Sequence, residues 1–283
     1  MPSAARVTLF TVGGAVLAFG VGSVAITGLI LLSSHDVAAQ EQFEFVGNTL
    51  TVNSDGGGVH LKRGQTAGVV DVDRKTTDSI WGADPEWDMD KTDGVLRLDT
   101  NCPPMYSVNC DGDYDVFVPP EVTVVKVRNN NGSVSVDNMH LDLLDLGSDN
   151  GSIKIRNSSS PVLKLSSDNG SISVNGTWAW QVSASSDNGS IRMTLKNEPD
   201  YVNASSDNGS LRVTVPAGTG TYNVTNDHDN GGGSVAAGLH DAASPRVLKL
   251  SSDNGSSRAY RGDEVQQPWP VQPAPPVPPK PAR

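Results

Sequence analysis

The chain has 283 residues, and its 32 Asp and Glu against 21 Lys and Arg give a formal net charge of −11. Nucleic acid is not an expected partner, because recognition of its phosphates depends on clustered Lys and Arg. The sequence contains no P-loop, dinucleotide-binding or nucleophile-elbow motif, and its five histidines are scattered. We therefore expect no enzymatic activity, no cofactor and no metal site.

The N-terminal segment is the most apolar part of the chain. No charged residue occurs between Val7 and Leu32, and a stretch of about 26 such residues can cross a bilayer. We expect a single-pass cell-membrane protein whose N-terminus is cytoplasmic and whose remaining chain is extracytoplasmic. The expected segments are a cytoplasmic N-terminus at 1–8, a transmembrane helix at 9–32 and a linker at 33–42. A cleaved signal peptide ending near Val37-Ala38-Ala39 is the alternative.

Residues 43–262 carry short stretches in which apolar and polar residues alternate, the pattern of half-buried strands. Before residue 120 these stretches are irregular, and they lie at 49–53, 54–61, 95–98 and 114–118. We interpret this part as the first coils of a repeat domain, together with a longer insertion. The insertion holds Trp81, Trp87 and the two cysteines.

The cysteines, Cys102 and Cys110, are separated by seven residues. No cluster of His or Cys accompanies them, whereas a zinc site needs three or four ligands. We expect a disulfide, which implies an oxidising compartment and agrees with an extracytoplasmic location. Two unpaired thiols are the alternative.

The string Ser-Asp-Asn-Gly-Ser occurs five times, beginning at Ser148, Ser167, Ser186, Ser206 and Ser252. The first four copies are 19, 19 and 20 residues apart, and such a fixed short period is typical of stacked repeats. Alternating strands flank each copy, as in Leu163-Lys-Leu165 before and Ile172-Ser-Val174 after one of them. Asp-Asn-Gly is expected to supply the positive φ of a sharp corner.

We predict an all-β fold in which residues 43–262 form a β-solenoid, because no single repeat can bury its own apolar row. An antiparallel meander or sandwich, with Asp-Asn-Gly closing hairpins, is the alternative. The first serine of each copy should face the core, and the asparagines should form an amide ladder along one edge. These asparagines are Asn150, Asn169, Asn188, Asn208 and Asn254. The proline-rich residues 263–283 should be an extended or disordered tail.

Two further groups of residues could carry chemistry. The repeats stack the aspartates Asp149, Asp168, Asp187, Asp207 and Asp253, with Asp229, along one corner. Calcium would relieve their repulsion, but the Gly-Gly-x-Gly-x-Asp repeat of calcium-binding β-rolls is missing, so we interpret these residues as turn formers. Trp178 and Trp180 share a face at a spacing of two, where they could stack on sugars or cap the core.

The order of these features resembles the bacterial DUF4097 family of toast-rack strand-repeat proteins over roughly Phe43–Gly262. The resemblance rests on the opening Ser54-Asp-Gly, the Cys-x7-Cys followed by Val118-Pro-Pro, and the Val-x-Val-x-Asn-x-Asn-Gly-Ser repeats. It implies a β-strand superhelix, often tethered in the bacterial envelope, with an adhesin label and no catalytic residues. No lipid-anchor cysteine lies near the N-terminus, so anchoring would rest on the helix.

We therefore expect a membrane-anchored, adhesin-like binding protein. Its partner would be a cell-wall polymer, a surface glycan or an envelope protein. The alternative is an envelope-stress sensor or scaffold that binds cationic molecules through an acidic β surface.

Overall fold

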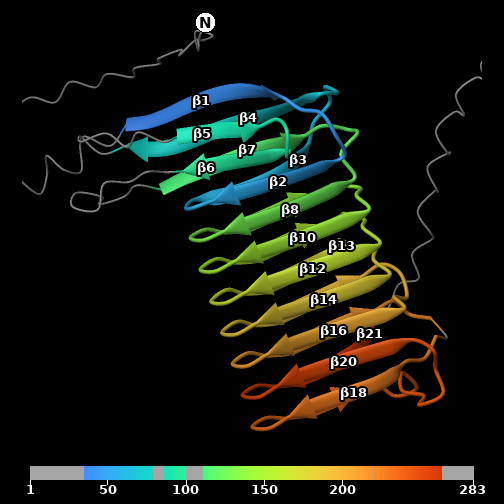
Figure 1. Ribbon diagram of the computed structural model, residues 1–283. Coiled ribbons are helices and arrows are strands. Elements are labelled where there is room, and N and C mark those ends of the chain that lie inside the picture. Colours follow the sequence, from blue (N-terminus) through green and yellow to red (C-terminus); the bar gives the residue numbers. More distant parts are fainter. Residues whose placement is uncertain (1–34, 79–85, 100–110, 219, 263–283) are drawn as a thin grey trace, which may run out of the picture.

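The computed structural model describes residues 35–78, 86–99, 111–218 and 220–262, and it is all-β over these ranges (Figure 1). Several expected features lie outside the described residues, namely the segments at 1–8 and 9–32, Trp81, the Cys102 and Cys110 pair, and the tail at 263–283. Within the described part of the chain, no helix is long and apolar enough to cross a membrane. The first strand begins at His35, before the expected domain start at residue 43.

Two sheets, here called sheet A and sheet B, face each other across the core. In spatial order, sheet A contains β1 (His35–Glu44), β4 (Val69–Asp78), β7 (Asp111–Val118), β3 (Gly58–Arg63), β9 (Val134–Asp137), β11 (Ile153–Arg156), β13 (Ile172–Thr177), β15 (Ile191–Leu195), β17 (Leu211–Val215), β21 (Ser257–Arg261) and β19 (Gly233–Val235). Sheet B contains β18 (Asn223–His228), β20 (Val247–Ser252), β16 (Tyr201–Ser206), β14 (Gln181–Ser186), β12 (Val162–Ser167), β10 (Leu143–Ser148), β8 (Val124–Asn129), β2 (Thr49–Ser54), β6 (Val95–Asp99) and β5 (Glu86–Asp90).

Each repeat is one coil that gives one strand to each sheet. Equivalent residues of successive coils are hydrogen-bonded neighbours in parallel strands, as in Leu144 with Leu163 and Ile153 with Ile172. The two strands that flank an Asp-Asn-Gly corner lie in different sheets, so the alternative in which these corners close antiparallel hairpins is wrong. Antiparallel pairing in the described residues is confined to β1–β4, β4–β7 and β5–β6 at one end.

Alternation along each strand places the apolar side chains in the core. In β12, Leu163 and Leu165 are buried while Lys164 and Ser166 are exposed. The facing strand β13 buries Ile172 and Val174 in the same way. Stacking in register therefore joins the Leu, Ile and Val residues into continuous columns, and hydrophobic burial along these columns stabilises the stack.

The glycines of the corners are required for a reason other than the expected positive φ. None of Gly151, Gly170, Gly189 and Gly209 has φ in the left-handed region, so that expectation is wrong. Instead, a Cβ at each of them would lie less than 3.0 Å from the carbonyl oxygen of the corner glycine in the preceding coil. The close stacking of coils leaves no room for a side chain there.

The first serine of each repeat faces inward, as predicted, and also connects neighbouring coils. The Ser186 hydroxyl donates to the carbonyl oxygen of Gly170 at 2.9 Å, and the same bond recurs from Ser148, Ser167, Ser206 and Ser252 to the glycines of their preceding coils. The segment Asn129-Asn-Asn-Gly-Ser133 is a degenerate copy of the repeat. Its Asn129 side-chain amide donates to the Gly57 carbonyl at 2.8 Å. These bonds satisfy carbonyl groups that the tight corner would otherwise leave without partners.

The last two coils are stacked out of chain order. Strand β20 lies between β16 and β18, and β21 lies between β17 and β19, so the C-terminal coil is inserted between the two coils that precede it in sequence (Figure 1). The inserted strand β20 buries Leu248 and Leu250, whereas β18 is largely exposed. A polar coil at the end of a stack protects the apolar coils from solvent.

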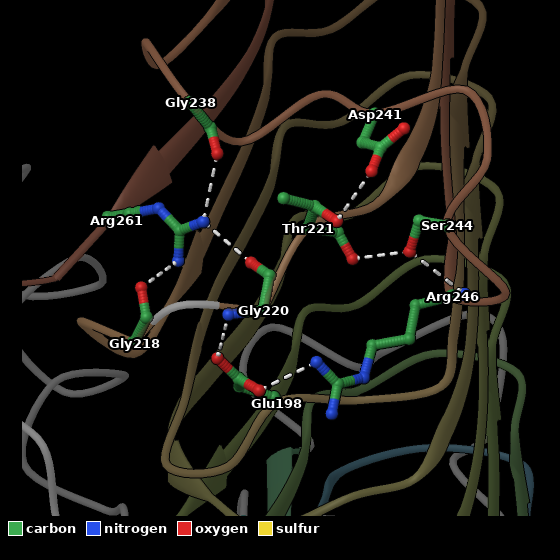
Figure 2. Close-up of polar contacts among 9 residues, drawn as sticks. All are labelled: Glu198, Gly218, Gly220, Thr221, Gly238, Asp241, Ser244, Arg246 and Arg261. Carbon is green, nitrogen blue, oxygen red and sulfur yellow. Dashed lines mark hydrogen bonds and ion pairs between the residues drawn. The ribbon is translucent and has the colours of Figure 1, made fainter.

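Polar contacts of two arginines fasten the connections that this insertion requires (Figure 2). Arg261 donates to the carbonyl oxygens of Gly218, Gly220 and Gly238 at 2.7, 2.6 and 3.1 Å. Arg246 forms an ion pair with Glu198 at 2.7 Å, and the second carboxylate oxygen of Glu198 accepts the Gly220 N–H at 3.0 Å. These contacts therefore hold together the chain segments around Gly218, Gly220 and Gly238, which connect the reordered coils.

Candidate binding surface

The outward-facing side chains of sheet A form the surface with the most varied chemistry, here called the sheet A face. Two depressions lie on it. The first has a volume of about 440 Å³ and lies over β3, β7, β9 and β11. The second has a volume of about 340 Å³ and lies over β13, β15, β17 and β21.

Charged side chains in the first depression are paired with one another. Lys62 contacts Asp115 at 2.8 Å. Arg156 binds Asp137 through two bonds of 2.6 and 2.7 Å, a bidentate geometry that is stronger than a single contact. The hydrogen bond from Arg156 lowers the pKa of Asp137 below its ordinary value. The charges of this depression are thus largely neutralised within the protein.

The first depression also brings together a serine, a histidine and an aspartate. His60 Nδ1 lies 2.5 Å from Ser135 Oγ, and its Nε2 lies 3.5 Å from Asp113 Oδ1. Strand β9, which carries Ser135, is paired on both sides with β3 and β11, so its backbone N–H groups are used in the sheet and cannot stabilise an oxyanion. The Asp113 side chain is 63% exposed. The three side chains therefore form a polar cluster on the sheet A face.

The second depression contains three arginines that occupy equivalent positions in adjacent strands. Arg192 of β15 pairs in register with Arg212 of β17, and Arg212 pairs with Arg258 of β21. All three are exposed. The Arg212 guanidinium lies 5.3 Å from the ring centre of Tyr260, within the range of a cation–π contact. We call these three residues the arginine ladder.

Sequence reasoning did not identify the arginine ladder. The signal was present, because each arginine follows the first residue of the strand after an Asn-Gly-Ser corner, as in Ile191-Arg192 and Leu211-Arg212. The alignment that predicted the asparagine column also aligns these residues. The Ser135–His60 contact joins residues 75 positions apart. Its prediction would have required the pairing register of β3 with β9, which the irregular first coils do not indicate.

The predicted asparagine ladder is confirmed at the exposed corner edge. The Asn169 amide donates to Asn150 Oδ1 at 3.0 Å, and Asn188 donates to Asn169 at the same distance. The complete ladder runs in spatial order through Asn131, Asn150, Asn169, Asn188, Asn208, Asn254 and Asn230. Each amide oxygen in its interior accepts from the next coil, so the ladder fixes the spacing of the corners.

The aspartates of the corners lie beside this ladder and are exposed: Asp149, Asp168, Asp187, Asp207, Asp253 and Asp229. In the part of the chain that the structure describes, no group of three or more His, Cys, Asp or Glu side chains could hold a metal ion. The corner is therefore an acidic edge, separate from the sheet A face.

The tryptophans divide between two environments. Trp180 is 51% exposed and Trp178 is half-buried, while Ala179 between them is buried. The buried Asn197 side chain holds Ala179 by accepting its N–H at 2.9 Å and donating to its carbonyl at 2.8 Å. Tyr201 is 37% exposed, and its N–H donates to the Trp180 carbonyl at 3.1 Å. Both aromatic residues are thus exposed near the corner that precedes the strands of sheet B.

Comparison with known families and solved structures finds proteins that are similar to this chain. The family model described as Toastrack DUF4097 matches residues 47–257. No curated protein matches the chain. Similar solved structures include a candidate adhesin from Bacteroides fragilis, with 13% identity, a TM-score of 0.46, and coverage of 79% of this chain and 96% of that one. A candidate adhesin from Parabacteroides merdae has 10% identity, a TM-score of 0.44, and coverage of 80% and 96%. A candidate cell adhesion protein from Clostridium sporogenes has 9% identity, a TM-score of 0.34, and coverage of 81% and 100%.

Proposed function

Because the chain belongs to the Toastrack DUF4097 family, we propose that it is an adhesin-like binding protein, held at the cell membrane, that contacts an envelope or surface ligand. The ligand would be a cell-wall polymer, a surface glycan or an envelope protein. The observation that carries the proposal is the in-register stack, which places the same outward side chains next to one another in adjacent coils, as in Arg192 with Arg212 and Thr194 with Thr214. Such a surface suits many weak contacts made in parallel.

The proposed location rests on the sequence. The uncharged segment 9–32, after the short N-terminus at 1–8, would be the membrane anchor, and residues 263–283 would be an extended spacer. A disulfide between Cys102 and Cys110 would fit an oxidising compartment. Extraction of membranes at high pH tests the anchor, because a spanning helix stays with the lipid and a protein with a cleaved signal peptide is released.

A role in binding rather than catalysis is supported by the geometry of the described residues. Strand β9, which carries Ser135 beside the histidine, is paired with strands on both sides, and two ion pairs in this depression join Lys62 with Asp115 and Arg156 with Asp137. The second depression contains serines and arginines but no acid that could serve as a general base.

Co-sedimentation of the purified full chain with isolated envelope material tests the proposal. We expect the chain to pellet with the envelope at low salt and to remain in the pellet at moderate salt. A chain that stays in the supernatant under every condition would sink the proposal and direct the search to soluble partners.

The acidic edge favours a second candidate function, in which the protein senses or collects cationic molecules in the envelope. The exposed corner aspartates are the specific observation behind it. Binding of a cationic peptide that disappears at high salt, while envelope binding persists, would separate the two functions, because exposed charges are screened beyond about 10 Å at 0.1 M salt.

A further inference from the structure

The arginine ladder differs from the other charged rows of the solenoid. Its strands β15, β17 and β21, together with the neighbouring β13, contain no Asp or Glu. Within the described residues, no ion pair includes Arg192, Arg212 or Arg258. Elsewhere on the same face, ion pairs join Lys62 with Asp115 and Arg156 with Asp137.

The ladder places like charges next to one another. Adjacent strands lie about 4.8 Å apart, so three positive charges are stacked at close spacing. Like charges in directly opposed positions repel one another. A chain with a net charge of −11 has acids available to neutralise these positions, yet none is placed there. A local cost of this kind is characteristic of a functional site.

Hydroxyl groups complete the second depression. Ser190, Ser210 and Ser256 lie along it from successive coils, with the Ser256 hydroxyl 3.3 Å from the Ser210 hydroxyl. Arginine provides planar, bidentate recognition of carboxylate and sulfate-like groups, and serine hydroxyls bond the hydroxyls of sugars. The depression thus offers two parallel rows along the stacking direction, one of arginines for acidic groups and one of serine hydroxyls for sugar hydroxyls.

We propose that the arginine ladder binds a linear anionic glycan, with the glycan chain running along the stack and successive acidic groups facing successive arginines. The inference rests on the proposed function and names its ligand class. A glycan of 1→4-linked uronic acid rings has one carboxylate per ring, so one chain presents several acidic groups to the arginines. A shorter anion would engage fewer arginines and bind more weakly, because the contacts act together.

The test uses the purified full chain and a fluorescent oligogalacturonate, with a heparin fragment, neutral dextran and oligothymidylate as comparison probes. The ladder variant replaces Arg192, Arg212 and Arg258 by Gln. The matched control replaces Lys126, Lys164 and Lys249 by Gln on the opposite sheet, where Asp145 lies between the first two lysines in register. Both variants lose three positive charges from exposed strand positions, so a general charge effect would change them equally.

We expect the ladder variant to bind oligogalacturonate about tenfold more weakly or worse, since paired charges control dissociation, and the lysine control to bind within about twofold of the parent chain. The heparin fragment distinguishes a carboxylate from a sulfate ligand. No binding of either anionic glycan, an equal loss in both variants, or tighter binding of oligothymidylate would overturn the inference. If the ladder variant still pellets with envelope material as the parent chain does, the inference fails while the proposed function stands.

Discussion

At each Asp-Asn-Gly corner, the glycine lies directly against the carbonyl group of the corner glycine in the preceding coil, and the serine before it bonds a carbonyl of that same coil. The side chains at these positions are therefore determined by contact between coils rather than within one coil. The occurrence of both residues in every exact copy of the repeat follows from this contact. The corner asparagine adds an exposed side-chain hydrogen bond to the asparagine of the preceding coil.

Replacement of Gly189 by Ala tests this account at a single residue. The new Cβ would lie less than 3.0 Å from the Gly170 carbonyl oxygen, so the coils must separate, and we expect a loss of about 1–3 kcal/mol of stability. Gly232→Ala is the matched control, because a Cβ there has no atom within 4 Å and its φ is not left-handed. Urea unfolding midpoints measure both variants, and equal midpoints would contradict the explanation.

The buried tyrosines predict a dependence of stability on alkaline pH. Burial raises the pKa of Tyr114 to about 12 and raises the pKa of Tyr222 further, whereas an unfolded tyrosine ionises near pH 10. Between about pH 10 and pH 12 the unfolded chain releases protons that the folded chain keeps, so the free energy of unfolding should fall as the pH rises. The stabilising contribution is complete below about pH 10.

Tyr114→Phe checks the assignment. The Tyr114 hydroxyl is buried without a hydrogen-bond partner, so its removal leaves no group unpaired and should be close to neutral at pH 7. We expect the decline of stability at alkaline pH to be shallower in this variant. An unchanged slope in urea denaturation across the alkaline range would show that Tyr114 does not contribute.

At the scale of elements, the regular strands and their pairing followed from the sequence, because a two-residue alternation and a fixed period determine which residues face the core. The expected strand around Leu163–Leu165 is β12, and the one around Ile172–Val174 begins β13. The spatial order of the last two coils could not be predicted from the alternation and the period. The exact copy at Ser252 pairs with the exact copy at Ser206, although the degenerate corner at Asp229 lies between them in sequence.

The physical reason for this order is the apolarity of the two coils. Leu248 and Leu250 are buried because β20 has a strand on each side, whereas the polar strand β18 can lie at the end with one side exposed. A rule that places the most apolar coil inside would have predicted the insertion. The antiparallel strands β1 and β5 at the other end belong to irregular sequence whose pairing partners no repeat indicates.

Arg261→Ala tests the fastening of the inserted coil. Loss of its bonds to three carbonyl groups should cost about 2 kcal/mol and should increase amide hydrogen exchange in the segments around Gly220 and Gly238. Exchange in the central strands β12 and β14 should not change, since stacked coils open locally. Lys249→Ala, at an exposed position in the same coil, is the control. Equal exchange in both variants would mean that Arg261 does not hold these segments.

At the scale of the whole molecule, the net charge of −11 does not represent the local charge of any one surface. Acids line the corner edge, paired charges fill one half of the sheet A face, and unpaired arginines fill the other half. The repeat period correctly predicted a β-solenoid, whereas the composition gave only the net charge and placed the acidity on the β surface in general. Alternating charges along a strand become rows only after the coils are stacked, and the sign of each row depends on the register.

The central claim is that the sheet A face, rather than the opposite sheet, contacts the ligand in the envelope. A photo-crosslinking amino acid placed at Thr194 on β15 and, in a second chain, at Ser185 on β14 tests it directly, because both positions are exposed on opposite sheets at the same level of the stack. We predict that the Thr194 chain crosslinks to envelope material and that the Ser185 chain does not. Crosslinking from Ser185 alone, or equally from both, would contradict the account.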